Sequence, residues 1–332
     1  MSIVFTKKHK SVILYKQKPS VKHIIDLKGD DSLKNILVVG SINIDLTIHS
    51  DRFPKTGETV MGHSFAASPG GKGANQAIAV GKLGGIVKML GNVGDDAYGQ
   101  VLIDNFNKNG VIFCGQKLKD TPTGTAVITV SGGNNTIIID SGANGCVTEK
   151  TIDDNCELFE WADIVIFQLE IPVASVCRGI KLAKECGCFV ILNPAPYIDL
   201  PKEIFAFTDM VIPNETECQL LTGILPEDNG STLLALEKMQ AMGIKRPLIT
   251  LGDKGSAFIK DGSLVICPAR KVTAVDTTAA GDCFIGAMSL MLANGASLEG
   301  AVATATVASS IAVSRKGASD SIPTAEELGE ML

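Results

Sequence analysis

Short runs of apolar residues that stop at glycine or at polar residues recur along the chain and predict buried β-strands. The first such run is Ile36–Val39, which ends at Gly40. From about residue 160, similar runs alternate with segments long enough to form helices. These later runs cover residues 164–167, 189–192, 210–212 and 248–250. Alternating strands and helices are typical of a parallel sheet with right-handed crossovers. We therefore predict an α/β protein with a Rossmann-like, mostly parallel central sheet flanked by helices.

Another group of segments has a mixed or partly alternating pattern, which favours a small sheet with one solvent-facing side. These segments are residues 42–47, 59–65, 125–130 and 136–140. The last two flank the turn-like run Gly132–Asn135, as in a hairpin. We predict one main domain over residues 35–332, with a small β-sheet lid at about 42–66 and 122–140. Two helices are predicted near residues 280–293 and 298–314.

Residues 1–34 differ from the rest because lysines dominate and acidic residues begin only at Asp26. We interpret them as a solvated or weakly ordered extension. An organelle-targeting segment or a small docking arm are the alternatives, although transit peptides are usually richer in Arg and Ser. No apolar run reaches the ~20 residues that a membrane-spanning helix needs, and no secretory signal is evident.

The composition narrows the class of protein. Nine scattered cysteines indicate reduced thiols and predict a cytoplasmic protein. A net charge of −6 gives no general footprint for nucleic acid. The chain lacks a P-loop and lacks a dinucleotide-binding G-x-G-x-x-G after its first strand. Its four histidines have no metal-ligand spacing, which disfavours a zinc enzyme or a Ser-His-Asp hydrolase.

The run Asp276–Asp282 opens a long apolar helix with small residues, which would let a ligand approach the backbone. The free N–H groups and the positive dipole end of that helix would face an anion. Asp282, in the first turn, could accept a proton from a substrate hydroxyl there. The alternative is an acidic cap on an ordinary core helix.

Two further motifs carry groups suited to hydroxyl-rich ligands. The glycine-rich run Pro69–Gln76 opens another helix, and its Lys72 and Asn75 can hydrogen-bond hydroxyls. Asn43 and Asp45 follow the first strand and lie two residues apart, so they share one face of an extended chain. An amide and an acid on one face suit vicinal diol hydroxyls. A plain turn or edge strand is the alternative.

The order of the motifs resembles the ribokinase branch of the PfkB carbohydrate kinase family. The motifs are G-S-I-N-x-D, G-G-K-G-A-N-Q-A, Q-L-E, N-P-A-P, P-N-E-T-E, T-L-G-x-x-G and D-T-x-A-A-G-D. The resemblance covers roughly residues 35–325. It implies a ribokinase-like fold with a β lid, ATP-dependent phosphorylation of ribose at O5, and a homodimer formed through the lid.

The resemblance also implies roles for individual residues. It implies Asp282 as the catalytic base, with an anion hole formed by the amides of Ala279, Ala280 and Gly281. The implied ribose contacts are Asn43, Asp45, Gly71, Lys72, Asn75 and Glu170, together with Asp282. The implied nucleotide contacts are Asn214, Gly281 and the loop residues Thr250, Gly252, Asp253, Lys254 and Gly255.

The resemblance also implies that the protein binds two ions, Mg²⁺ and K⁺. Glu217 matches a residue that holds Mg²⁺ through water. The positions that match a K⁺ site are Asp276, Thr278, Ala312, Arg315, Gly317 and Ser321. The chain departs from the family pattern at Ala279, where Gly is frequent, and at Cys283, where Thr is common and a thiol would add sensitivity to oxidants.

Alternative functions remain open at this point. A kinase for 2-deoxyribose or for a nucleoside would use the same motifs. A non-catalytic, sugar-sensing protein would be expected to lack Asp282 or Gly281, and both are present. A nicotinamide-dependent dehydrogenase would need the fingerprint that is missing after the first strand.

Overall fold

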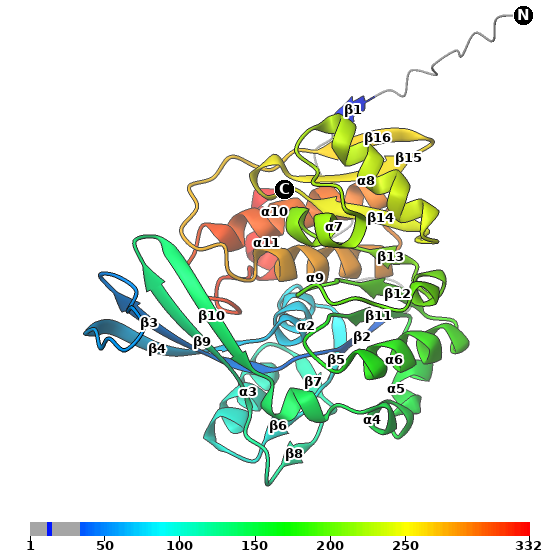
Figure 1. The fold of residues 1–332 in the computed structure, drawn as a ribbon. Helices are drawn as coiled ribbons and strands as arrows, with labels where there is room; N and C mark the ends of the chain where they lie inside the picture. Colours follow the sequence, from blue (N-terminus) through cyan, green and yellow to red (C-terminus); the bar gives the residue numbers. More distant parts are fainter. Residues whose placement is uncertain (1–11, 15–33) are drawn as a thin grey trace, which may run out of the picture.

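The computed structural model describes residues 12–14 and 34–332, and a mostly parallel sheet runs through it (Figure 1). The prediction for residues 1–34 therefore lies almost wholly outside the described residues. Within the described part the sheet has ten strands. In sheet order they are β1 (Val12–Leu14), β16 (Ser263–Cys267), β15 (Ser256–Lys260), β14 (Arg246–Thr250), β13 (Met210–Val211), β12 (Phe189–Leu192), β11 (Ile164–Phe167), β2 (Asn35–Val39), β5 (Ile86–Leu90) and β7 (Val111–Phe113).

The strands from β14 to β7 pair in parallel, and only β15 runs against its neighbours. The central strands are nearly continuous apolar runs because both of their faces are buried. The predicted Rossmann-like α/β fold is therefore confirmed. The strands at residues 86–90 and 111–113, the β15–β16 pair and the parallel pairing of β1 with β16 had not been predicted.

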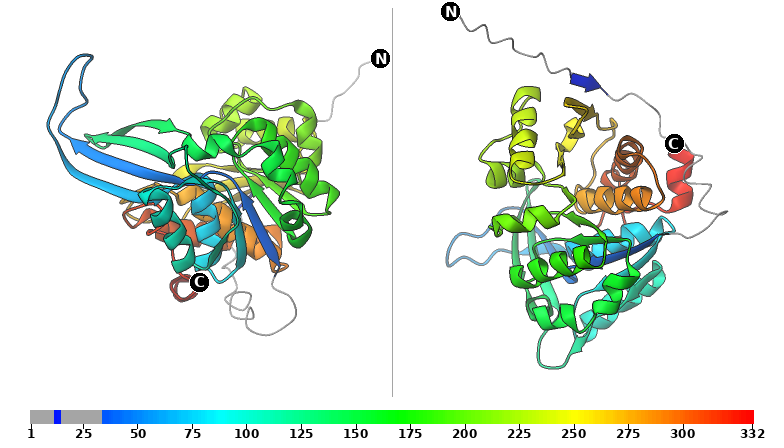
Figure 2. Two further views of the ribbon diagram at one scale, coloured as in Figure 1. Left: turned by 90° about the horizontal axis from the view of Figure 1, so that it is seen from below. Right: turned by 90° about the vertical axis from the view of Figure 1, so that its right-hand side faces the viewer.

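Helices cover both faces of this sheet (Figures 1 and 2). Ile36 and Val38 point into a core made with one group of helices, whereas Leu37 and Val39 point into a core made with the other. The first group is α2 (Lys72–Lys82), α3 (Ala97–Lys108), α9 (Ala280–Ala293), α10 (Leu298–Val313) and α11 (Ala325–Met331). The second is α4 (Glu149–Asp153), α5 (Cys156–Trp161), α6 (Val173–Glu185), α7 (Glu215–Thr222) and α8 (Asn229–Ala241). None of the described helices is long and apolar enough to cross a membrane.

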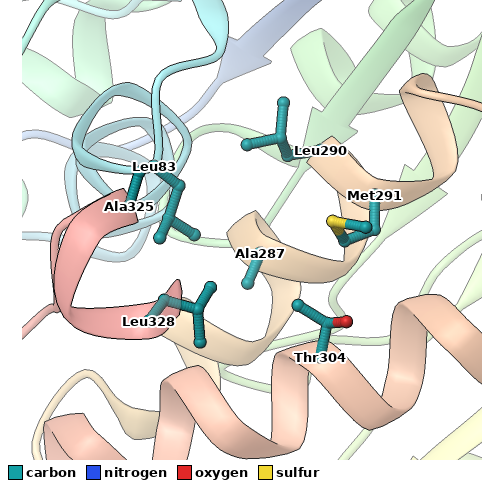
Figure 3. Close-up of a pocket in the computed structure, with 7 residues that line it drawn as sticks. All are labelled: Leu83, Ala287, Leu290, Met291, Thr304, Ala325 and Leu328. Atoms are coloured by element: carbon teal, nitrogen blue, oxygen red, sulfur yellow. The ribbon is translucent and has the colours of Figure 1, made fainter. Parts of the chain in front are cut away.

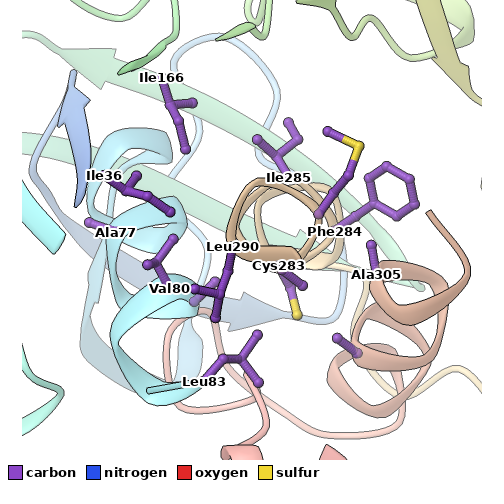
Figure 4. Packing of buried hydrophobic residues seen from close by; sticks show 14 of the residues in the cluster. Ile36, Ala77, Val80, Leu83, Ile166, Cys283, Phe284, Ile285, Leu290 and Ala305 are labelled. Carbon is purple, nitrogen blue, oxygen red and sulfur yellow. The ribbon is translucent and has the colours of Figure 1, made fainter. Parts of the chain in front are cut away.

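The contact between α2 and α9 matters most for the site, because both helices begin at it. Val80, Leu83 and Leu290 belong to the apolar core that these two helices share (Figure 4). Nearby, a cavity of about 10 Å³ lies among α2, α9, α10 and α11 and is lined almost entirely by apolar side chains (Figure 3). Its apolar lining offers a water molecule almost no hydrogen-bond partners.

A second sheet projects from the main body (Figures 1 and 2). Its order is β10 (Asn134–Asp140), β9 (Gly124–Ser131), β3 (Asn43–Ser50) and β4 (Gly62–Gly70). The predicted segments 42–47, 125–130 and 136–140 fall largely on β3, β9 and β10, whereas the segment 59–65 overlaps only the first part of β4, which runs on to Gly70, shortly before α2. The small sheet is thus continuous with the glycine-rich start of that helix.

Short elements complete the described chain. A two-stranded sheet joins β6 (Val93–Gly94) and β8 (Lys117–Leu118). Three 3₁₀ turns are η2 (Gly142–Cys146), η3 (Lys202–Phe207) and η4 (Gly252–Lys254).

Candidate active site

The polar motifs gather at one edge of the central sheet. Strands β2, β11, β12, β13 and β14 are parallel neighbours, so their carboxyl ends meet at this edge. The loops that follow them carry the motifs singled out in the sequence. The small sheet begins at the same place, because β3 starts shortly after the end of β2.

Asp282 lies in the first turn of α9 and is buried, with 8% of its surface exposed. Both of its carboxylate oxygens accept hydrogen bonds from α2. Asn75 Nδ2 donates to Oδ2 at 3.1 Å, and Gln76 Nε2 donates to Oδ1 at 2.9 Å. Each oxygen keeps a second lone pair for a ligand. The buried Oδ1 of Asn75 has no partner among the described residues, so it is a second acceptor at the same place.

The backbone before Asp282 suits an anion. Ala279 caps α9 in the left-handed region at φ 57°, a conformation that costs an L-residue about 1 kcal/mol. This explains why glycine is frequent there in the family pattern and marks a strained backbone beside the site. Ala280 N–H closes a turn on Thr277 O at 3.2 Å. A Cβ added at Gly281 would meet nothing within 4 Å, so the start of α9 faces open space.

Asp45, on β3, faces this space from the small sheet. Burial raises the pKa of Asp45 to about 7, with further contributions from the carboxylates of Glu170 and Asp282, while Lys72 opposes them. A Cβ at Gly70 would lie 2.1 Å from Asp45 Oδ2, so only glycine allows this close approach. With a pKa of about 7, the carboxyl group of Asp45 therefore gains or loses its proton near neutral pH.

Asn43 stands beside it and is held by a residue that sequence reasoning missed. Asn144 donates from Nδ2 to Asn43 Oδ1 at 2.7 Å, and its Oδ1 accepts from the Ile42 amide at 2.8 Å. The amide group of Asn43 therefore has a fixed orientation, with its NH₂ left for a ligand. Gly71, at φ 92°, packs against the Asn43 backbone, where a Cβ would lie 2.7 Å from its nitrogen.

Lys72, the first residue of α2, supplies positive charge among the acids. Burial alone would lower the pKa of this ammonium, but Asp282 and Glu170, followed by Glu217 and Asp45, raise it. Lys72 N–H also donates to Glu170 Oε2 at 3.1 Å. Lys72 therefore stays charged at any pH at which the protein functions.

The loop after β13 contributes Asn214 and Glu217. Asn214 caps α7, with its Oδ1 accepting from the Glu217 amide at 2.8 Å, and Glu217 Oε2 accepts from the Asn214 amide at 2.9 Å. Burial raises the pKa of Glu217, while the Asn214 amide and Lys72 lower it. Because Glu217 acts electrostatically on both Lys72 and Asp282, α7 belongs to the same cluster.

The predicted nucleotide loop follows β14. Thr250 N–H bonds to Pro213 O at 3.0 Å, and Leu251 N–H bonds to Gly255 O at 2.7 Å, which closes the loop over η4. Gly252 and Gly255 both have positive φ. Asp253 is exposed, and Lys254 Nζ turns to Glu227 O at 3.2 Å. This loop lies beside the start of α7, since a Cβ at Gly252 would lie 3.7 Å from Glu215.

The two stretches predicted to bind K⁺ lie side by side. Asp276 accepts hydrogen bonds from the Thr278 amide at 2.9 Å and from the Gly317 amide at 3.1 Å. Burial works against ionisation of Asp276, but these hydrogen bonds outweigh it and lower its pKa. Ala312 O accepts from the Arg315 amide at 3.0 Å, while the Arg315 guanidinium pairs with Glu327 and leaves the loop.

The second stretch is tied to the site through α2. Ser321 is buried and donates to Ala318 O at 2.8 Å. Lys82, at the end of α2, donates to the carbonyl oxygens of Ser319 at 3.1 Å and Ile322 at 2.6 Å. One helix therefore holds the acidic cluster at its beginning and this loop at its end.

Among the described residues, no group of three or more His, Cys, Asp or Glu side chains could hold a metal ion by itself. A divalent ion here would need ligands from a substrate or from water, which is how Mg²⁺ is usually bound with phosphates. The carboxylate of Glu217 fits that role. The carbonyl-rich loops around Asp276 fit a hard monovalent cation.

Cys283 is fully buried, and burial raises the pKa of its thiol to about 12. Because the thiolate is the reactive form, this cysteine is protected. The expectation that it adds thiol sensitivity is therefore not supported by its surroundings.

Sequence reasoning brought forward Asp282, Asn75, Asp45 and Lys72, and the structure places them in one cluster. It did not single out four buried amide side chains that bond to site residues or to one another. Those side chains are Gln76, Asn144, Gln168 and Asn193. Gln76, Gln168 and Asn193 lie inside sequence motifs that were noted for other residues of those motifs. Their presence in these motifs is therefore the signal by which they could have been found.

Comparison with known proteins identifies the same family that the sequence motifs resemble. A family model described as "pfkB family carbohydrate kinase" matches residues 33–325. A ribokinase of Bacillus subtilis is 38% identical over 301 residues, covering 90% of this chain and all of the relative. A deoxyribokinase of Salmonella typhi is 34% identical, covering 90% of this chain and 98% of the relative. The solved structure of Arabidopsis thaliana ribokinase complexed with ribose and ATP superposes with a TM-score of 0.85 at 34% identity, covering 90% of this chain and 99% of that one.

Proposed function

The chain belongs to the pfkB family of carbohydrate kinases, and from this premise we propose that it transfers the γ-phosphoryl group of ATP to the 5-hydroxyl of D-ribose. The observation that carries the proposal is Asp282, a buried carboxylate at the start of a helix that faces open space. Relatives named ribokinase match this chain over almost their full length.

Asp282 acts as the general base. Its two oxygens are held by amide donors from α2, and their remaining lone pairs can accept the proton of the attacking hydroxyl. The backbone N–H groups of Ala279 and Gly281 stabilise the negative charge that develops on the phosphoryl oxygens, while the Ala280 N–H, bonded to Thr277 O, holds the turn in shape. Little covalent work is needed, so positioning dominates the catalysis.

The small sheet holds the sugar. Asp45 accepts from adjacent hydroxyls and Asn43 offers its NH₂, while Asn75 Oδ1, Lys72 and Glu170 lie around the same space. When the lid at about 42–66 and 122–140 closes over the sugar, it excludes water, which strengthens each of these contacts. Asn214 and the loop Thr250–Gly255 hold the nucleotide.

Mg²⁺ and K⁺ are the proposed ions. Glu217 would hold Mg²⁺ through water beside the phosphates, where the ion neutralises phosphate charge. Asp276, the carbonyl-rich stretch 312–317 and Ser321 would hold K⁺. The adjacency of these two stretches supports that placement. Nine free thiols support a reducing compartment, the cytoplasm, as the location.

The test of the proposed function is phosphorylation of a panel of pentoses by purified protein with ATP and Mg²⁺, with and without K⁺. We expect turnover on D-ribose that rises when K⁺ is added, read as ADP release and as ribose 5-phosphate by mass spectrometry. Turnover on 2-deoxyribose with the higher kcat/KM would move the substrate to that sugar, a result that the similarity to a deoxyribokinase makes a specific alternative. Ribose binding without turnover on any sugar would contradict a kinase and favour a sensor.

We also propose that two copies pair through the lid. The lid exposes several large apolar side chains, which a monomer rarely leaves together in water. They are Met61, Phe65, Val127, Ile137, Ile138 and Ile139, each at least 45% exposed. The sheet also ends in two edge strands, β10 and β4, whose backbone groups a second copy could cover.

Replacing Ile138, the most exposed of the three isoleucines on β10 at 74%, tests this pairing. We expect Ile138→Lys to shift the protein from dimer to monomer at micromolar concentration in light scattering after size exclusion, because a buried ammonium would destabilise the interface. Leu234→Lys, an equally drastic change at an exposed leucine of α8, serves as the control and should remain dimeric. A monomeric wild-type protein would contradict the proposal.

A further inference from the structure

Three buried amide side chains form a connected group beside Asp282. Gln76 belongs to α2, Gln168 follows β11, and Asn193 follows β12. Gln76 and Gln168 are fully buried, and Asn193 is 7% exposed. Three amide groups in an otherwise apolar interior are costly unless each is paired in a defined way.

Hydrogen bonds join these side chains into one chain that ends on the carboxylate. Gln168 Nε2 donates to Gln76 Oε1 at 2.7 Å. Gln76 Nε2 donates to Asp282 Oδ1 at 2.9 Å and to Asn193 Oδ1 at 3.2 Å. Asn193 in turn uses its Nδ2 to donate to Ile212 O at 2.9 Å.

Groups that can only accept fix the direction of these bonds. Ile212 O can only accept, so Asn193 must present its NH₂ to it and its oxygen to Gln76. The Gln76 NH₂ therefore faces Asn193 and Asp282, which leaves its oxygen to accept from Gln168 Nε2. Gln168 Oε1 has no partner among the described residues, so the chain of bonds is anchored at Ile212 O and at the carboxylate.

The orientation of the Gln76 amide matters because the Lys72 ammonium also attracts the Asp282 carboxylate. The charged groups that face it from the surrounding elements are Lys72 at the start of α2, Asp45 on β3 and Glu217 on α7. An ion pair with the Lys72 ammonium would turn the carboxylate away from an incoming hydroxyl. Two directed N–H donors, one from Asn75 and one from Gln76, hold the carboxylate in place against that pull.

We propose that Gln76, oriented by Gln168 and Asn193, is the positioning residue that keeps Asp282 aimed at the substrate hydroxyl. The inference rests on the proposed role of Asp282 as general base. Gln168 and Asn193 act only through Gln76, so they position the base without touching the substrate. An amide that only filled space in the core would not need a fixed orientation of its oxygen and its NH₂ group.

The test compares Gln76→Met and Gln168→Met, which remove the donors with little change of volume, and their double variant. We expect Gln76→Met to lower kcat roughly tenfold or more, with the ribose KM within about threefold of wild type, because one charge-assisted hydrogen bond is lost only at the base. Gln168→Met should lower kcat by about three- to tenfold.

The double variant separates a chain from two independent packing effects. If Gln168 acts through Gln76, the double variant should resemble Gln76→Met alone, whereas full additivity of the two losses would overturn the proposal. Thr208→Val removes a buried hydroxyl whose partner is Ile204 O, away from the cluster, and should keep the wild-type kcat and pH profile.

Two outcomes keep this inference separate from the proposed function. Absence of ribose phosphorylation by the wild-type protein would remove the function and the inference together. A wild type that is active, beside a folded Gln76→Met variant with unchanged kcat, would overturn the inference alone. If Gln76→Met does not fold, unchanged kcat in Gln168→Met would overturn it equally.

Discussion

Asp282→Asn is expected to lower kcat by ~10²–10⁴-fold, the range for loss of a general base, while ribose and ATP still bind. The asparagine keeps the size of the side chain but cannot accept the proton of the attacking hydroxyl. It also places an NH₂ group against one of the two amide donors from α2, Asn75 or Gln76. The measurements are steady-state phosphorylation of ribose and calorimetric binding of the sugar and the nucleotide.

A helix-cap control distinguishes catalysis from local structure, because an acid near the start of a helix could serve only the helix. Asp228 caps α8 by accepting from the Ser231 amide at 2.7 Å and lies on the surface. Asn caps a helix as well as Asp does, so Asp228→Asn should retain wild-type turnover. If Asp282→Asn behaves in the same way, Asp282 is not the base.

The alternation of apolar runs and helical segments was enough to predict the parallel sheet, because strands such as Ile164–Phe167 are buried on both faces and read as unbroken apolar runs. The strand Ile86–Leu90 was missed because Lys88 interrupts its pattern, and Val111–Phe113 because it is so short. The pairing of Val12–Leu14 with β16 uses backbone bonds of exposed residues. Such a strand has no hydrophobic periodicity to reveal it.

The residues of the site also fall into those that the sequence could predict and those that it could not. The positions of Asp45 and Asp282 could be anticipated, because residues at strand ends and helix starts converge in an α/β fold. The buried amides could not be assigned, since Gln76 meets its partner Asp282 across 206 residues of chain. Only the packed structure decides whether an amide in an apolar helix faces the core or an acid. The catalytic and binding roles of the individual residues stay predictions.

The raised pKa of Asp45 makes its substitution the second informative change. A carboxyl group whose pKa is raised from 3.8 to about 7 in the folded protein penalises folding when it is ionised. The penalty is absent below pH 4, grows between pH 4 and 7, and is complete above pH 7, where its upper bound is about 4 kcal/mol. Asp45→Asn removes it, so the free variant should melt at a higher temperature than the wild type at pH 8 and show a smaller difference at pH 5.

The same substitution should weaken the enzyme. The ionised form of Asp45 accepts the sugar hydroxyls, so kcat/KM of the wild type for ribose should rise with pH through about 7. Asp45→Asn should lower kcat/KM at pH 8 by ~10–100-fold, the loss expected for hydrogen bonds to a charged group, mostly through KM, and should flatten this rise. Asp140→Asn, at an exposed acid on β10, is the matched control for a lost lid charge. A variant that loses affinity but gains stability would mark Asp45 as a group kept for binding at the expense of the free fold. A variant with wild-type KM and an unchanged melting temperature would remove Asp45 from the sugar site.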